Sequence, residues 1–257
     1  MPDPIVVITR PPAQAGELAQ RVRELGREVA LFPLLEILPL ADQRSLRETL
    51  SDLERYALIA FVSPNAIDAA FCARPDWPHQ LSLAVVGEGS RIALARRGIT
   101  GENSVIFSPR NLERTDSQTL LEELDLAALR DREVLIVRGE TGRELLGDAL
   151  RAAGARVTAI AAYRRAAPDF TEARRSELKR LLCCQNDWIV TSSEALRFLT
   201  QMVAQLDEAE GVVKMQQQRI LVSHARIAET AESLGFRHII RTRSGDDGLL
   251  AALQSLS

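Results

Sequence analysis

One pattern occurs twice in this chain, as Phe61-Val62-Ser63-Pro64-Asn65-Ala66-Ile67 and as Val190-Thr191-Ser192-Ser193-Glu194-Ala195-Leu196. Each copy ends a short apolar run, places a serine next, and then begins a helical pattern. Ser63 and Ser192 lie 192 − 63 = 129 residues apart in a chain of 257 residues. A repeat at half the chain length is the strongest indicator of architecture that a sequence offers. It predicts two similar halves.

Further matching segments support this repeat. An offset of 128 residues relates Gly26-Arg27-Glu28-Val29 to Gly154-Ala155-Arg156-Val157. The register then slips, since Arg91-Ile92-Ala93 and Arg226-Ile227-Ala228 lie 135 residues apart. Two similar halves with a cleft between them suit a binding or catalytic protein better than a structural one.

The composition argues against several classes of protein. A chain of 257 residues with 46% hydrophobic residues is long enough for two globular domains. The 32 Lys and Arg against 35 Asp and Glu give a net charge of −3, and 4% of residues are aromatic, which argues against binding of nucleic acid. No apolar run reaches the roughly 18 residues of a membrane span, and the N-terminus lacks a signal-peptide pattern. We therefore expect a cytoplasmic protein that binds no membrane.

The sequence shows no familiar motif for a metal or a cofactor. The segment Gly87-Glu88-Gly89-Ser90-Arg91-Ile92 begins like a dinucleotide-binding fingerprint but has isoleucine where the third glycine is required. The three histidines are scattered, and three cysteines make no disulfide framework. Cys183 and Cys184 could be a redox pair, but neighbours on a helix point apart, which favours idle thiols. We expect neither a metal nor a cofactor.

Short apolar runs alternate with amphipathic patterns along the chain. The runs are continuous, as in parallel strands that are buried on both faces. We predict strands at Ile5–Thr9, Val29–Phe32, Leu58–Val62, Leu83–Val86, Val105–Phe107, Val134–Val137, Val157–Ile160, Trp188–Thr191, Ile220–Val222 and His238–Arg241. Apolar residues three or four apart predict helices between them. These include Ala13–Leu25, Arg44–Arg55, Arg143–Ala153, Glu172–Cys183 and Ile227–Leu234.

This alternation predicts an α/β fold with right-handed crossovers. Ten strands over two halves give two similar, flavodoxin-like domains, each a five-stranded parallel sheet flanked by helices. Two extended segments that end at prolines break the pattern at equivalent places, Pro33–Pro39 and Ala161–Pro168. We interpret them as a two-stranded extended connector that could serve as a hinge. Two surface loops within one large sheet are the alternative.

The residues that follow the predicted strands are candidates for a binding site, because ligands of such sheets bind beyond the carboxyl ends of the strands. Small hydroxyl residues and glycine dominate there, and most of them begin a helix, whose free N–H groups attract anions. Arginines beside these turns add bidentate donors. The candidate ligand-binding residues are Arg10, Ser63, Asn65, Gly87, Ser90, Ser108, Arg110, Arg138, Gly139, Arg143, Ser192, Ser193, Ser223, His224 and Arg226.

Taken together, these turns predict a site for a polyanion that carries carboxylates or phosphates. Each residue alone has a simpler explanation, since serine and threonine cap helices in many proteins and surface arginines are solvated. His224 could act as an acid, although a position at a helix start explains it more simply. The sequence lacks the motifs of a P-loop and of a hydrolase nucleophile elbow. An enzyme of this kind must rely on positioning, electrostatics and at most one weak acid.

Four segments of the chain follow one another in the same order as the motifs of a known family. They are Val62-Ser63-Pro64-Asn65-Ala66-Ile67, Val85-Val86-Gly87-Glu88-Gly89-Ser90, Arg138-Gly139-Glu140 with the helix start after it, and Ala162-Tyr163-Arg164. They resemble, in turn, the Thr-Ser-x-x-Ala-Val turn, the Val-Gly-x-x-Thr turn, the glycine-containing turn and the tyrosine-bearing connector of the uroporphyrinogen-III synthase family. Their order, spacing and number make the match fairly specific over nearly the whole chain.

The resemblance implies two domains joined by paired connectors. Residues 1–33 and 168–257 would form one discontinuous domain, 39–162 the other, and 34–38 and 163–167 the connectors. It also implies a hydro-lyase of haem and tetrapyrrole biosynthesis. This enzyme cyclises hydroxymethylbilane to uroporphyrinogen III, with inversion of the terminal pyrrole ring and loss of water. The acetate and propionate arms of that substrate fit the predicted anion-binding turns.

The resemblance makes Tyr163 the candidate catalytic residue, as proton donor to the departing hydroxyl. A phenol is a weak acid at neutral pH, so we expect loss of Tyr163 to slow catalysis without abolishing it. The other candidates would hold acid arms. One turn departs from the family, because Ser223-His224-Ala225-Arg226 stands where Gly-Pro-x-Thr is frequent. Arg226 could replace a neutral donor there by a charged one.

Two other functions remain open from the sequence. A hinged two-domain protein could bind an anionic metabolite without catalysis, and a two-domain transferase could use a nucleotide sugar, although no nucleotide fingerprint is present. The expected partner is the linear tetrapyrrole, with no nucleic acid and no membrane. We expect a monomer, and a transient contact with the upstream enzyme that produces hydroxymethylbilane is left open.

Overall fold

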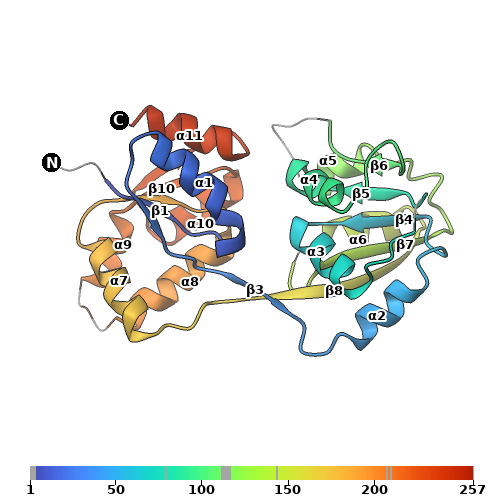
Figure 1. Cartoon of the computed structure of the whole chain (residues 1–257), viewed down its shortest axis with the longest axis horizontal. Coiled ribbons are helices and arrows are strands. Elements are labelled where there is room, and N and C mark those ends of the chain that lie inside the picture. Colours follow the sequence, from blue (N-terminus) through green and yellow to red (C-terminus); the bar gives the residue numbers. More distant parts are fainter. Residues whose placement is uncertain are drawn as a thin grey trace. The chain divides into compact units, whose positions relative to one another are not determined.

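The computed structural model describes residues 4–78, 80–110, 117–142, 144–206, 208 and 210–256. The chain divides into two compact units (Figure 1). Unit 1 comprises Met1–Glu36 and Ala166–Ser257, and unit 2 comprises Ile37–Arg165. Both ends of the chain therefore build one unit, and the middle builds the other. The two crossings fall within the segments 34–38 and 163–167, which the sequence analysis expected as connectors.

Unit 1 contains a parallel sheet with the strand order β11-β10-β9-β1-β2, counted over the described residues. Figure 1 shows helices on both faces of this sheet. In chain order its elements are β1 (Val6–Ile8), α1 (Pro12–Glu24), β2 (Val29–Leu31), α7 (Glu172–Leu182), β9 (Asp187–Ile189), α8 (Ser193–Ala204), α9 (Gly211–Gln216), β10 (Arg219–Val222), α10 (Ala225–Ser233), β11 (His238–Arg241) and α11 (Asp246–Gln254).

Unit 2 contains a sheet with the order β3-β8-β7-β4-β5-β6, in which the strands from β8 to β6 pair in parallel. Its elements are β3 (Glu36–Pro39), α2 (Arg44–Ser51), β4 (Leu58–Phe61), α3 (Pro64–Ala73), β5 (Leu83–Val85), α4 (Glu88–Arg96), β6 (Ile106–Phe107), α5 (Ser117–Leu121), β7 (Glu133–Gly139), α6 (Leu145–Ala152) and β8 (Arg156–Ala166).

The expectation of five strands is wrong for unit 2, whose described part has six. The first predicted connector supplies the additional strand β3, and the second continues β8 as far as Ala166. A proline in β3 is tolerated because β3 lies at the edge of the sheet. The connectors are therefore hydrogen-bonded parts of a sheet.

The continuous apolar runs of the sequence arise because both faces of each sheet are buried. Within β1, Val6 and Ile8 pack in a cluster with α1 and α11, whereas Val7 packs with Trp188 in a cluster that includes α7, α8 and α10. All of these strand residues have no exposed surface. Side chains of a strand alternate between faces, so a sheet between two helical layers needs apolar residues at every position.

The two sheets repeat one order of equivalent strands. Starting from β2, unit 1 reads β2-β1-β9-β10-β11, and unit 2 reads β8-β7-β4-β5-β6 after its additional edge strand. The residue offsets found in the sequence relate β2 to β8 and β9 to β4, and the common strand order relates β1 to β7. In both units the strand order reverses once, between β1 and β9 and between β7 and β4. Such reversal points are where parallel α/β sheets bind ligands, at the carboxyl ends of the strands.

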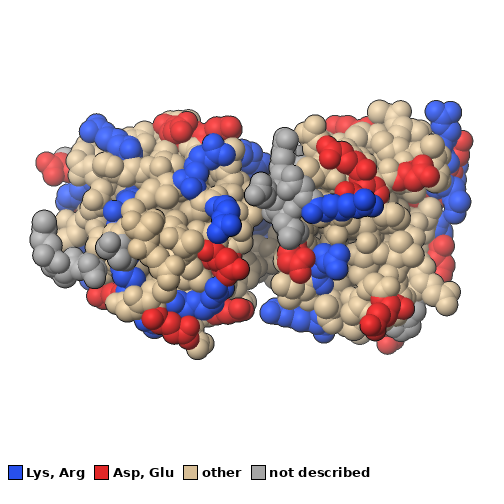
Figure 2. All heavy atoms as spheres, turned by 90° about the horizontal axis from the view of Figure 1, so that it is seen from above, with Lys and Arg blue, Asp and Glu red and all other residues tan. Residues whose placement is uncertain are grey.

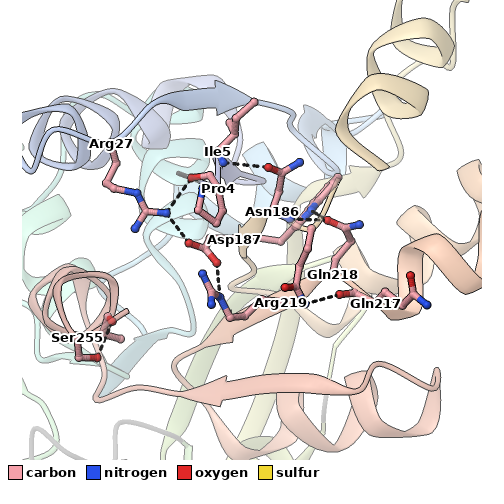
Figure 3. A network of polar contacts seen from close by, with 12 residues as sticks. Pro4, Ile5, Arg27, Asn186, Asp187, Gln217, Gln218, Arg219 and Ser255 are labelled. Atoms are coloured by element: carbon pink, nitrogen blue, oxygen red, sulfur yellow. Dashed lines mark hydrogen bonds and ion pairs between the residues drawn. The ribbon is translucent and has the colours of Figure 1, made fainter. Parts of the chain in front are cut away.

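The amino edge of the sheet in unit 1 holds a buried ion network (Figure 3). Asp187, at the start of β9, has no exposed surface. Arg27 Nη2 donates to Asp187 Oδ2 at 2.7 Å and to the carbonyl of Pro4 at 2.8 Å. Arg219 pairs with the second oxygen of Asp187. The network joins the N-terminal segment, β9 and β10 at the edge opposite to the predicted binding turns.

Candidate active site

The repeated serines lie at the reversal points of the two sheets. Ser63 follows β4, which pairs with β7, and Ser192 follows β9, which pairs with β1. Arg138 and Gly139 are the last two residues of the neighbouring strand β7 in unit 2, and Arg10 follows the neighbouring strand β1 in unit 1. The structure thus brings together, within each unit, the candidates that follow its two central strands.

Ser63 is the N-cap residue of α3. Its backbone is extended, and its Oγ accepts a hydrogen bond from the N–H of Ala66 at 3.2 Å. Pro64 occupies the first helical position, where its missing N–H costs no hydrogen bond. Asn65 follows within the first turn of α3 and is half-buried. Ser63 therefore faces the carboxyl edge of the sheet with a side chain that is fixed by the helix start.

Tyr163 is held by burial and by contacts with two neighbouring strand ends. Its side chain is 4% exposed, and its Oη lies 3.0 Å from Ser63 Oγ. The register of β7 and β8 shifts between Arg138 and Gly139, so that Gly139 comes opposite Tyr163. The N–H of Glu140 donates to the carbonyl of Tyr163 at 2.8 Å. This local irregularity, of a kind frequent beside active sites, directs the phenol toward the end of β4.

Gly139 makes room for the phenol ring. A Cβ at this position would lie 3.0 Å from Tyr163 Cζ and 3.2 Å from its Oη. Contacts that short require the ring to move. The sequence analysis predicted Gly139 as a backbone donor to the ligand, whereas in the structure its close neighbour is the Tyr163 ring.

Three of the candidate arginines, which lie at or near the ends of strands, carry carboxylate partners. Arg10 Nη2 lies 2.7 Å from Asp246 Oδ1 at the start of α11, with side chains that are 17% and 29% exposed. Arg138 pairs with Glu144, the N-cap residue of α6. Arg110, which is mostly exposed, pairs with Glu123 at 2.9 Å. An incoming carboxylate would replace an internal one at each arginine, so these cations add less to binding than free ones would.

The paired hydroxyls of unit 1 are used within the unit. Ser192 is the N-cap residue of α8, and its Oγ accepts from the N–H groups of Glu194 and Ala195 at 3.2 and 3.4 Å. Ser193 is 6% exposed, and its Oγ receives a hydrogen bond from Thr230 of α10 at 3.0 Å. Ser193 thus links α8 to α10, and we leave it out of the proposed site.

The remaining candidates lie at neighbouring turns of the same carboxyl edges. In unit 2, Gly87 is the N-cap residue of α4, and Ser90 in the first turn of that helix is buried. Ser108 follows β6 and accepts from Arg91 Nη1 at 3.2 Å. Arg143 lies outside the described residues.

In unit 1, the turn from β10 into α10 carries three candidates. Ser223 is half-buried, and His224 occupies the N-cap position of α10 with an exposed side chain. Arg226 lies in the first turn of the helix and is exposed. Its carbonyl accepts from Thr230 at 2.9 Å.

Sequence reasoning missed the groups that complete these contacts. Asp246 and Glu144 were not candidates, although each begins a helix beside an arginine. The pairing of Ser63 with Tyr163 joins residues 100 positions apart.

Charges of both signs are mixed on the face of the molecule seen in Figure 2. Within the described ranges, no group of three or more His, Cys, Asp and Glu side chains is arranged to hold a metal ion. In the same part of the chain, no helix combines the length and the apolar character that a bilayer span needs.

Comparison with known proteins identifies the family. A family model for uroporphyrinogen-III synthase HemD matches residues 16–251. The chain belongs to the uroporphyrinogen-III synthase family. The resemblance found in the four motifs is thereby confirmed, and the family makes the chain an enzyme of tetrapyrrole biosynthesis that acts on a tetrapyrrole.

Two relatives match over nearly their whole length. Uroporphyrinogen-III synthase of Escherichia coli (strain K12) is 31% identical over 257 residues, covering 97% of this chain and 99% of the relative. The synthase of Salmonella typhimurium is 30% identical with the same coverage of both chains. The family resemblance therefore extends through both units.

Solved structures of the family confirm the fold. Uroporphyrinogen-III synthetase from Helicobacter pylori matches with a TM-score of 0.65 at 13% identity, covering 99% of this chain and 100% of that one. A mutant synthase from the extremely thermophilic bacterium Thermus thermophilus matches with a TM-score of 0.61 at 15% identity, covering 99% of both chains. At such identities the likeness concerns the fold alone.

Proposed function

We propose that this chain converts hydroxymethylbilane to uroporphyrinogen III as a cofactor-independent hydro-lyase. Protonation of the hydroxymethyl oxygen lets it leave as water and produces an electrophilic azafulvenium cation. An inner carbon of the terminal pyrrole bonds to this centre and forms a spiro intermediate. The intermediate fragments and recloses with the terminal ring inverted. Loss of a proton from the newly bonded carbon then restores the pyrrole, so the proton taken up in the first step is returned.

The role of the protein in this proposal is control of conformation. Direct closure without inversion is easy, so the enzyme must hold the chain in the arrangement that leads to the spiro intermediate. Acid arms on every ring offer many points of attachment. In each unit, hydroxyl groups and helix N-termini at the carboxyl edge provide donors for carboxylates. The arginines at these edges would bind a substrate carboxylate in place of their internal carboxylate partners.

The observation that carries the proposal is the position of Tyr163. A nearly buried phenol whose hydroxyl reaches the reversal point of a parallel sheet has the placement expected of a proton donor. We assign to it the protonation of the departing hydroxyl. The turns at Ser192, Gly87 and Asn65 are assigned to the acid arms.

The test is an isomer analysis. The protein is incubated with freshly made hydroxymethylbilane, and the oxidised products are separated by isomer and compared with an enzyme-free blank. We expect the type III isomer, formed faster than the blank. Formation of the symmetric type I isomer alone, at the blank rate, would end the proposal. Tight binding of the substrate without faster closure would favour a binding protein instead.

A further inference from the structure

The hydroxyl of Ser63 already has partners within unit 2. Its Oγ accepts from the N–H of Ala66 at 3.2 Å and lies 3.0 Å from the Oη of Tyr163. The sequence analysis predicted Ser63 as a ligand of an acid arm. A hydroxyl has one hydrogen and two lone pairs, so these two contacts use most of its capacity. The geometry connects Ser63 to the phenol more directly than to a substrate carboxylate.

The helix start biases this contact in one direction. An N–H group at the N-terminus of α3 donates into Ser63 Oγ and carries the positive end of the helix dipole. A hydroxyl that accepts such a bond becomes a better donor through its own hydrogen, because hydrogen bonds in a chain polarise one another. Its hydrogen is therefore best used toward an oxygen that gains negative charge. The oxygen in reach is that of Tyr163.

We infer that Ser63 is a positioning residue for Tyr163. The hydroxyl of Ser63 donates to the phenol oxygen of Tyr163 and stabilises the phenolate that forms when Tyr163 gives its proton to the departing hydroxyl. This inference rests on the proposed function. The phenolate regains a proton when the newly bonded pyrrole carbon loses its hydrogen, so no further reactant is needed. Hydrogen bonds to a charged group are stronger than those to a neutral one. The contact with Ser63 therefore favours the charged state most.

In unit 1 the equivalent serine, Ser192, has no phenol at the matching position. Ser192 caps α8 through two N–H groups. At an offset of 128, Tyr163 corresponds to Leu35, a buried aliphatic residue. Both tyrosines of the chain, Tyr56 and Tyr163, belong to unit 2. The serine of the repeat thus has a common capping role, and the role toward a phenol is particular to unit 2.

A kinetic cycle tests the inference. Ser63→Gly removes the hydroxyl at little cost to the helix cap, and we expect it to lower kcat about tenfold, as loss of a hydrogen bond to a charged group would, with little change in KM. In a Tyr163→Phe background the same change should lower kcat no further. Ser63→Thr should restore most of the turnover. Losses that multiply in the double variant would overturn the inference.

A matched cap variant controls for helix stability. Thr171 is the N-cap residue of α7, and its hydroxyl accepts from the N–H of Arg174 at 3.4 Å. Thr171→Gly removes a cap of the same kind without touching a tyrosine. We expect it to leave kcat unchanged. An equal fall in kcat for Thr171→Gly and Ser63→Gly would reduce Ser63 to a structural role.

A spectroscopic arm is independent of the reaction. With two tyrosines in the chain, Cζ-labelled tyrosine gives two NMR signals, and Tyr163→Phe assigns one of them. Ser63→Gly should shift the Tyr163 signal and leave that of Tyr56 in place. If the signal does not move, the contact is absent and the inference fails, even for an active synthase. If the signal moves but the wild type makes no type III isomer, the proposed function fails and the inferred catalytic role falls with it.

Discussion

The two units repeat one strand order but differ at both edges of their sheets. At the carboxyl edge, Ser63 and Ser192 both cap a helix, but Ser63 of unit 2 also contacts the phenol of Tyr163. At the amino edge, unit 1 buries Asp187 between two arginines. The repeat therefore supplies a common strand arrangement, within which polar groups are distributed unequally.

The amino edge of unit 2 is apolar at the corresponding positions. The offset of 129 relates Asp187 to Leu58, and the offset of 128 relates Arg27 to Ala155. Register supports the first match, because Val6 pairs with Asp187 as Val134 pairs with Leu58. Leu58 has 1% and Ala155 7% of its surface exposed, and both pack in one cluster. The same strand arrangement thus accommodates an ion network in unit 1 and an apolar cluster in unit 2 at equivalent positions.

The largest expected effect concerns the stability of unit 1. Asp187→Ala leaves two arginines without their carboxylate, which should lower the free energy of unfolding of unit 1 by about 3–5 kcal/mol. The chain has two tryptophans, Trp77 in unit 2 and Trp188 in unit 1. Fluorescence of Trp188 during urea unfolding, in a Trp77→Phe background, reports on unit 1 alone.

A combined variant serves as the control for this change. Arg27→Ala with Asp187→Leu reproduces the two residues of unit 2 at the equivalent places. Arg219, with a side chain that is 21% exposed, can then reach water. The pair of changes should therefore cost less than Asp187→Ala alone. A larger loss from the pair would contradict the view that the two amino edges are interchangeable.

The next effect concerns the difference at the carboxyl edge. Tyr163→Phe should lower kcat about 100-fold, the lower end of what a positioned acid contributes, because the phenylalanine ring keeps the packing and loses the proton. Tyr56→Phe is the matched control, since Tyr56 is equally buried in unit 2 and has no assigned role. Steady-state kinetics with hydroxymethylbilane measures both. Equal turnover of Tyr163→Phe and wild type would remove Tyr163 from the mechanism.

A smaller effect is expected from a substitution at Gly139, which lies against the phenol ring of Tyr163. Gly139→Ala places a Cβ 3.0 Å from Tyr163 Cζ, and displacing the ring by a few tenths of an ångström should lower kcat about tenfold. Gly142→Ala is the control, because its Cβ would have no heavy atom within 4 Å. Equal kinetics of the two alanine variants would show that the ring position is unimportant.

The smallest effect concerns Arg10 of unit 1. Asp246→Asn frees Arg10 from its carboxylate and should tighten binding of a polycarboxylate such as uroporphyrin III by about two- to fivefold, the value of a surface ion pair. Titration by fluorescence at constant salt measures the affinity. The control is Asp247→Asn, which frees Arg21 instead; the hydrogen bond from Arg21 to Asp247 raises the pKa of that guanidinium. Unchanged affinity in Asp246→Asn would mean that Arg10 contacts no acid arm.

Much of the fold could be predicted from the sequence because burial on both faces leaves a plain pattern. Each of the ten predicted strands occurs, with ends displaced by a few residues. The segment of β3 was predicted as half of a separate extended connector and not as a strand of the sheet, because Pro33–Pro39 contains two prolines and a glutamate, which disfavour a strand within a sheet. Its pairing with β8 at the edge of the sheet makes it a strand.

Less of the site could be predicted, because its contacts depend on register and on distant residues. The sequence pattern placed Ser63 and Ser192 after strands at helix starts, and the structure has each as the N-cap residue of the helix that follows β4 or β9. The contact of Ser63 with Tyr163 depends on the shift of register at Gly139, which no local pattern encodes. The partner of Arg10 lies near the other end of the chain. A sequence read in order does not show such pairs.

We hold that the carboxyl edge of unit 2 supplies the proton, while other contacts set which isomer forms. The isomer ratio formed by Tyr163→Phe at high enzyme concentration tests this most sharply. We predict slow closure that still yields the type III isomer. Type I isomer at the blank rate from this variant would contradict it, since the phenol would then be needed for the arrangement of the substrate as well as for the proton.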